Sequence, residues 1–94
     1  TTIGIVMTNA CFDKSRLCKI ARMAQNGLAR SIRPVHTSAD GDSVYAMSVG
    51  TVQADMDMVG TLAADVMSEA ILSAVKNAET AYGYISANDF LTEY

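Results

Sequence analysis

The sequence lacks most features of disulfide-rich, metal-binding and membrane proteins. It has no tryptophan, one proline, one histidine and two cysteines among 94 residues. Two cysteines are too few for a disulfide framework, and the spacing of Cys11 and Cys18 is not that of a metal site. We find no uncharged apolar run of the roughly 18–20 residues that a membrane span needs, and no signal segment. These absences predict a cytoplasmic protein with no membrane partner.

Acidic residues are missing from one stretch near the N-terminus. Six of the seven basic residues lie between positions 14 and 33, and all ten acidic residues lie outside that stretch. A basic stripe is one signature of nucleic-acid binding. No aromatic residues are interleaved with these cations, so stacking on bases has no support. We therefore favour a solvated or partner-facing surface and expect no nucleic-acid partner.

The first third of the chain shows a strand pattern followed by a helix pattern. Residues 1–8 (TTIGIVMT) are mostly β-branched or apolar, which is typical of a strand. Asp13 is a suitable N-cap for a helix over residues 14–31, where apolar residues recur every three or four positions. Pro34 excludes a continuation of that helix.

The remaining sequence predicts a second strand and a second, longer helix. Turn-forming residues at 36–42 precede an apolar strand at 43–50, which we expect Gly50 to end. A helix follows over 56–77, with apolar residues around most of its circumference. The tail, 80–94, holds three of the four tyrosines, and its sequence leaves open whether it docks on a neighbour or stays mobile.

This set of elements does not form a complete core. Both predicted strands are apolar on both sides, which is typical of strands buried on both faces of a sheet. A two-stranded sheet is marginally stable alone, and so short a chain leaves much of its surface unburied. The order strand–helix–strand–helix therefore predicts an α/β segment, residues 1–94, of a larger domain that another chain completes.

A threonine, Thr1, stands at the first position of the chain. A hydroxyl with a free α-amine beside it forms a nucleophile that carries its own base. An unperturbed α-amine titrates at about pH 7.7–8.0, so roughly a tenth to a fifth of it is neutral at pH 7. Such an amine requires that the chain be cut there. Removal of an initiator methionine would give the same first residue without any function.

A second group of polar residues is Asp40-Gly41-Asp42. In extended backbone, carboxylates two residues apart lie on the same side of the chain. Like charges that close raise the pKa of one partner, so the pair can hold a proton near neutrality. The same pattern is also typical of a solvated surface turn, and the further acids of a calcium loop are missing.

The combination of Thr1 with HTSADGDSVYAMSVGT and a long apolar helix resembles a known family. It is similar to the small β-chain of self-processing N-terminal-nucleophile hydrolases that are related to the L-aminopeptidase D-amidase/esterase. Within that family it most resembles the branch that hydrolyses 6-aminohexanoate (nylon) oligomers. Other branches more often have Ser at the first position, and Ser with Glu where this chain has Asp40 and Asp42. The resemblance covers nearly all 94 residues.

The resemblance implies a precursor that cuts itself just before Thr1 into a larger α-chain and this β-chain. Both chains would share a four-layer αββα sandwich, and the heterodimers would assemble further, commonly into a tetramer of heterodimers. Thr1 would be the nucleophile for autocleavage and for hydrolysis, with Asp40 and Asp42 as the carboxylates that orient and activate it. The reaction would open linear amides through an acyl-enzyme, with oxyanion donors from the α-chain and with neither a metal nor an organic cofactor.

Three alternatives remain open. The first is a related self-processing aminopeptidase or amidase with another amide substrate. The second is a thiol–imidazole pair made by Cys11 or Cys18 with His36, although a lone histidine is more often a hydrogen-bonded loop residue. The third is a non-catalytic subunit-assembly domain whose apolar helix docks on a partner, in which Thr1 has no importance.

Overall fold

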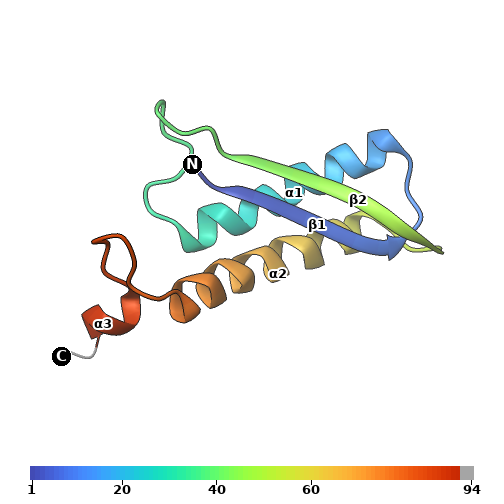
Figure 1. The fold of residues 1–94 in the computed structure, drawn as a ribbon. Helices are drawn as coiled ribbons and strands as arrows, with labels where there is room; N and C mark the ends of the chain where they lie inside the picture. The colour runs from blue at the N-terminus through green and yellow to red at the C-terminus, as the bar shows by residue number, and fades with distance from the viewer. Residues whose placement is uncertain (92–94) are drawn as a thin grey trace.

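The computed structural model describes residues 1–91 as a two-stranded parallel sheet with helices packed against it (Figure 1). In chain order the elements are β1 (Ile3–Ala10), α1 (Lys14–Ser31), β2 (Ser43–Val52), α2 (Met56–Asn77) and α3 (Ala87–Leu91). The mixed α/β class and the order of the four main elements are confirmed. Residues 92–94, the end of the predicted tail, lie outside the described residues.

Both long helices begin at the caps that the sequence contains. Asp13 accepts a hydrogen bond from the backbone N–H of Arg16 at 3.0 Å. Asp55 accepts one from the backbone N–H of Met58, also at 3.0 Å. Each bond satisfies a donor of the first turn that has no partner within the helix. The predicted bounds of both helices are confirmed.

β1 and β2 pair in parallel, starting with Ile3 opposite Ser43. β1 lies two residues further along the chain than predicted. The prediction that Gly50 ends the second strand is wrong, because β2 continues to Val52. The strand pairing shifts near Gly50, where a β-carbon would collide with the backbone carbonyl of Asn9. Glycine therefore permits a bulge at this position and does not terminate the strand.

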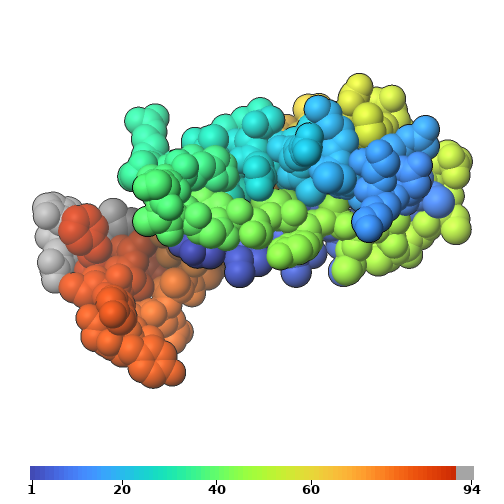
Figure 2. Space-filling view, turned by 90° about the horizontal axis from the view of Figure 1, so that it is seen from above, coloured from blue at the N-terminus to red at the C-terminus, as the bar shows by residue number. Residues whose placement is uncertain are grey.

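The two long helices lie on the same side of the sheet, and Figure 2 shows α1 lying along β2. Ile20 and Leu28 of α1 are fully buried between these layers. Burial of a large apolar side chain contributes about 1.5–3 kcal/mol to folding. The other buried apolar residues of this core are Ala24 of α1 with Ala63 and Met67 of α2.

The opposite face of the sheet is uncovered. The side chains of Ile3, Ile5 and Met7 are 69%, 65% and 65% exposed. β2 adds three exposed apolar side chains to this face, those of Tyr45, Met47 and Val49. The described helices therefore cover one side of the sheet, and the predicted cover of the other side by another chain stays a prediction.

α2 is also buried on one side only, although its apolar residues extend around most of its circumference. Its side away from α1 exposes four large apolar side chains, those of Met58, Leu62, Val66 and Leu72. α2 is long enough, and with a mean hydropathy of 1.4 apolar enough, to cross a membrane. The sequence was not expected to contain such a helix. Its inner face packs on α1, where Arg30 and Asp65 form a 2.8 Å ion pair. We therefore interpret α2 as a core helix with an uncovered outer face.

The tail forms a turn and the short helix α3 beyond the end of α2 (Figure 1). The side chain of Asn88 donates to the backbone carbonyl of Lys76 at 2.7 Å, so α3 is tied to the last turn of α2. The radius of gyration is 15.4 Å, against about 12 Å for a compact domain of this length. The elongated shape is consistent with the uncovered apolar faces.

Two glycines lie where α1 and α2 approach each other closely, so substitution by alanine tests the distance between the helices. A β-carbon on Gly27 would lie 2.5 Å from the backbone oxygen of Ala64 and 3.0 Å from the backbone nitrogen of Ser68. At Gly60 the obstacle is the flexible side chain of Met23. We predict that Gly27→Ala lowers the free energy of unfolding by about 1–3 kcal/mol, because backbone must move.

Gly60→Ala is the matched comparison. The methionine can rotate away, and alanine gains about 1 kcal/mol in helix propensity over glycine, so the net change should be smaller. Thermal and denaturant unfolding of the complete protein measure both values. Equal effects of the two substitutions would show that the helices do not approach as closely at Gly27 as the structure indicates.

Candidate active site

The first residue and the loop before β2 meet at one end of the sheet (Figure 1). Because the strands are parallel, their N-terminal ends lie side by side. The backbone carbonyl of Thr2 accepts a hydrogen bond from the N–H of Ser43 at 2.9 Å, which extends the pairing. The fold thereby brings Thr1 next to Asp40 and Asp42, the residues that the sequence predicts to act with it.

The hydroxyl and the amine of Thr1 both contact this loop. The backbone N–H of Gly41 donates to Thr1 Oγ1 at 3.2 Å. The Thr1 nitrogen lies 3.6 Å from Oδ1 of Asp40. The side chain of Thr1 is 49% exposed and that of Asp40 is 24% exposed. Both reactive groups of Thr1 are thus oriented by the protein and accessible from solvent.

Asp40 is held in its ionised form by neighbouring donors. The hydroxyl and the backbone N–H of Thr37 both donate to Asp40 Oδ2 at 2.8 Å. These hydrogen bonds, with a smaller contribution from the Thr1 ammonium group, lower the pKa of Asp40 below its ordinary value. The sequence predicted that repulsion raises the pKa of one of the two carboxylates, and for Asp40 the direction is the opposite.

Asp42 holds the backbone around the site. Its carboxylate, 6% exposed, accepts from the backbone N–H of Thr2 at 2.8 Å through Oδ1. Its Oδ2 accepts from the backbone N–H of His36 at 3.1 Å and lies 3.0 Å from His36 Nδ1. At the start of the chain, Asp42 thus binds the backbone of Thr2, whereas Asp40 contacts the amine of Thr1. The two aspartates therefore have different positions in the site.

Two contributors to the site, Thr37 and the N–H of Gly41, were not predicted. Thr37 and Asp40 form a T-x-x-D pattern, in which an acidic side chain reaches back to the N–H three residues earlier, and this signal was present in the sequence. The Gly41 N–H is a backbone group and has no sequence signature. His36 is a hydrogen-bonded loop residue, as expected.

The thiol–imidazole alternative is contradicted by the fold. Cys18 lies in the second turn of α1 and His36 follows the end of that helix. The helix between Cys18 and Ser31 extends about 20 Å. Cys11 follows β1, at the end of the sheet opposite to the site. Neither cysteine is therefore within reach of the imidazole.

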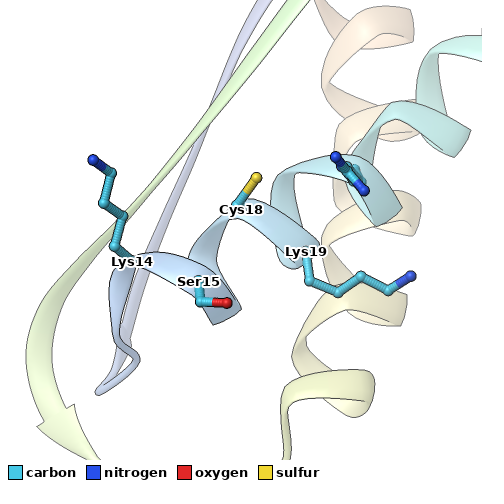
Figure 3. A pocket seen from close by; sticks show the side chains of 5 residues that line it. Lys14, Ser15, Cys18 and Lys19 are labelled. Carbon is cyan, nitrogen blue, oxygen red and sulfur yellow. The ribbon is translucent and has the colours of Figure 1, made fainter.

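The basic residues of α1 form a separate surface. Figure 3 shows Lys14, Ser15, Cys18 and Lys19 on the first turns of the helix, where they line a shallow groove together with Arg22.

Within residues 1–91, no cluster of three His, Cys, Asp or Glu side chains is placed to hold a metal ion.

An apolar groove of about 690 Å³ begins beside Thr2. It runs between β1, the end of α1 and the C-terminal half of α2, and Arg33 is the charged residue in its lining. Its large apolar residues are Ile3, Ile5, Ile32, Met67, Ile71 and Val75.

Comparison with known proteins decides the family. The model of peptidase family S58 matches residues 1–88. The chain belongs to peptidase family S58. This assignment confirms the peptidase and amide-hydrolase family predicted from the resemblance, and it does not identify the individual member. No solved structure matches the chain.

Relatives named aminopeptidase and relatives named 6-aminohexanoate-oligomer endohydrolase both match the chain. An uncharacterized aminopeptidase of Mycobacterium leprae is 39% identical over 88% of this chain and 27% of its own length. One from Mycobacterium tuberculosis is 35% identical over 95% of this chain and 30% of its own length. A 6-aminohexanoate-oligomer endohydrolase of Kocuria is 28% identical over 81% of this chain and 25% of its own length. The chain thus spans less than a third of these relatives.

The environment of Asp40 generates a prediction about pH. Thr37→Val removes the hydroxyl donor and keeps the backbone donor, so we expect the pKa of Asp40 to rise toward its ordinary value. A lowered pKa contributes stability above the unfolded value, and this is lost as the pH falls through the folded value. In Thr37→Val this contribution should therefore be smaller, and its loss should be complete at a higher pH than in the wild type.

A carbon-13 NMR titration of the aspartate carboxyl groups measures this shift. Thr61→Val is the control, since the Thr61 hydroxyl donates to the backbone carbonyl of Asp57 at 2.7 Å and touches no carboxylate. An Asp40 that titrates identically in Thr37→Val and in the wild type would refute the assigned cause.

Proposed function

We propose that this chain is the threonine-bearing β-chain of an N-terminal-nucleophile amide hydrolase, released from a longer precursor by cleavage just before Thr1. The observation that carries the proposal is the placement of Thr1, with its hydroxyl on the Gly41 N–H and its amine beside Asp40. Membership of peptidase family S58 supports amide-bond chemistry. The coverage of 27% and 30% of the aminopeptidase relatives is consistent with a piece of a longer polypeptide.

The proposed reaction uses the two groups of Thr1 together. Thr1 Oγ attacks the amide carbonyl while its proton passes to the neutral α-amine, directly or through one water. The carbon–nitrogen bond then breaks, the leaving amine takes the proton, and an ester on Thr1 remains. Water hydrolyses this ester and restores the hydroxyl. Asp40, kept ionised by its lowered pKa, orients the amine, and we expect the oxyanion donors to come from the partner chain.

The uncovered apolar surfaces support a partner from the same precursor. Parallel sheets are normally covered on both faces, yet Ile3, Ile5 and Met7 are exposed here. We propose that a larger α-chain packs on this face and completes a four-layer αββα sandwich. Such heterodimers would assemble further, and the outer face of α2 offers an apolar surface for either contact.

Two substrate classes fit this proposal. The first is linear 6-aminohexanoate oligomers, supported by Thr1 with Asp40 and Asp42 and by the apolar groove beside Thr2, which suits an aliphatic chain. The second is peptides or amides with a free amino-terminal residue. It is supported by the relatives named aminopeptidase, which are 39% and 35% identical, against 28% for the endohydrolase.

Substitution of Thr1 tests the nucleophile. In the full precursor, we predict that Thr1→Ala prevents cleavage and lowers amide hydrolysis by roughly a millionfold or to background, because no hydroxyl remains to attack. Thr1→Ser keeps a hydroxyl beside the amine and should still be cleaved. Gel analysis and product assays measure both effects, with Thr61→Ala as a remote threonine control. Normal hydrolysis by an uncut Thr1→Ala protein would eliminate Thr1 as the nucleophile.

A comparison of kcat/KM values tests the substrate. We expect the complete protein to hydrolyse linear 6-aminohexanoate oligomers at least tenfold better than amino-acid p-nitroanilides, because the groove beside Thr2 is apolar (roughly 1.4 kcal/mol of discrimination). The reverse ratio would assign the aminopeptidase activity. A correctly cleaved protein that hydrolyses neither class would contradict both substrate classes and favour the alternative of a self-processing amidase with another amide substrate.

A further inference from the structure

His36 adopts an unusual backbone conformation beside the candidate site. Its φ is 55°, in the left-handed region that only a few per cent of residues other than Gly adopt, with Asn, Asp and His the most frequent among them. In this conformation its backbone N–H and its ring Nδ1 both face Oδ2 of Asp42, at 3.1 and 3.0 Å. A disfavoured conformation persists when surrounding contacts determine it, and both of these contacts are made to one carboxylate oxygen.

Asp42 transmits this constraint to the start of the chain. Its Oδ1 accepts from the Thr2 N–H at 2.8 Å, and the Thr2 carbonyl accepts from the Ser43 N–H at 2.9 Å. The peptide groups on both sides of Thr2 are therefore fixed. Thr1 shares the first of these peptide groups, so the direction of its hydroxyl depends on where Asp42 is held.

The chemistry of the pair assigns the proton on the imidazole. Asp42 already accepts two backbone N–H groups, so its oxygen acts as an acceptor toward the ring. Nδ1 of His36 is then the donor, and the free lone pair of the neutral ring is on Nε2. Asp42 therefore receives its side-chain hydrogen bond from an N–H group that is bonded directly to Cγ of His36.

We propose that His36 is a positioning residue for Thr1: its two N–H donors lock Asp42 onto Thr2 and so fix the direction of the Thr1 hydroxyl. The inference rests on the proposed role of Thr1 as nucleophile. His36 acts through Asp42 and Thr2, and its ring takes no part in proton transfer.

Two substitutions at His36 separate the side-chain donor from the backbone conformation. Asparagine places an N–H donor where Nδ1 lies and tolerates the left-handed region. Glycine adopts this conformation freely and has no side-chain donor. In the complete protein, with the amide substrate that the wild type hydrolyses, we expect His36→Gly to lower kcat by roughly tenfold or more and to leave KM within about threefold. His36→Asn should recover most of that loss.

Two outcomes would overturn the proposal. A His36→Gly protein with wild-type kcat would show that the side-chain donor is dispensable. A His36→Asn protein as slow as His36→Gly would show that the ring itself, through Nε2, takes part in the reaction. Tyr82→Gly is the matched control, since Tyr82 has a φ of 53° on the tail and is 98% exposed. It relieves the same backbone conformation away from the site and should keep wild-type kcat.

A second measurement does not depend on turnover. In nitrogen-15 threonine-labelled complete protein, we expect the Thr2 amide to exchange with solvent at least tenfold faster in His36→Gly than in the wild type. The rate in His36→Asn should stay close to wild type. Unchanged exchange in His36→Gly would refute the positioning role, even with an active enzyme. An inactive wild type that still shows these exchange differences would refute the proposed function and leave the positioning of Thr2 intact.

Discussion

Parallel pairing of β1 with β2 is the constraint on which the site depends. A parallel pair requires the chain to cross back over the sheet, and α1 makes this crossing. The crossing returns the loop at residues 36–42 to the end of the sheet where the chain begins. Thr1 and Asp40 thereby become neighbours, although the sequence between them contains a whole helix.

The same topology fixes the groups of the candidate site but leaves one face of the sheet uncovered. Within this chain, donors and acceptors fix the hydroxyl and amine of Thr1, and Asp42 fixes the backbone behind them. The sheet is nevertheless covered on one face only. Ile3, on the uncovered face, is two residues from Thr1, so a chain that covered this face would also border Thr1, the proposed nucleophile. Completion of the core and completion of the active site would then be one assembly step.

Local signals allowed most of the fold to be predicted from the sequence. Asp13 and Asp55 cap helices whose bounds were predicted correctly, because capping and periodicity act over a few residues. The apolar faces of the strands and of α2 were predicted to need cover, and within the described residues only one side of each is covered. In the site, the roles of Thr1 and the two aspartates rest on a family resemblance and stay predictions, and the fold places these three residues together. The Thr37 donors to Asp40 had a signal in the T-x-x-D pattern, whereas the Gly41 N–H and the left-handed backbone of His36 arise from loop geometry that no residue pattern states.

The central claim is that Thr1 works as a free chain terminus. The most direct test is mass spectrometry of the active protein produced from its complete gene, under denaturing conditions that separate its polypeptides. We predict two chains, one of which begins at Thr1 with an unblocked amine. An active protein in which Thr1 remains inside an uncut polypeptide would contradict the claim, because the amine beside Asp40 would then not exist.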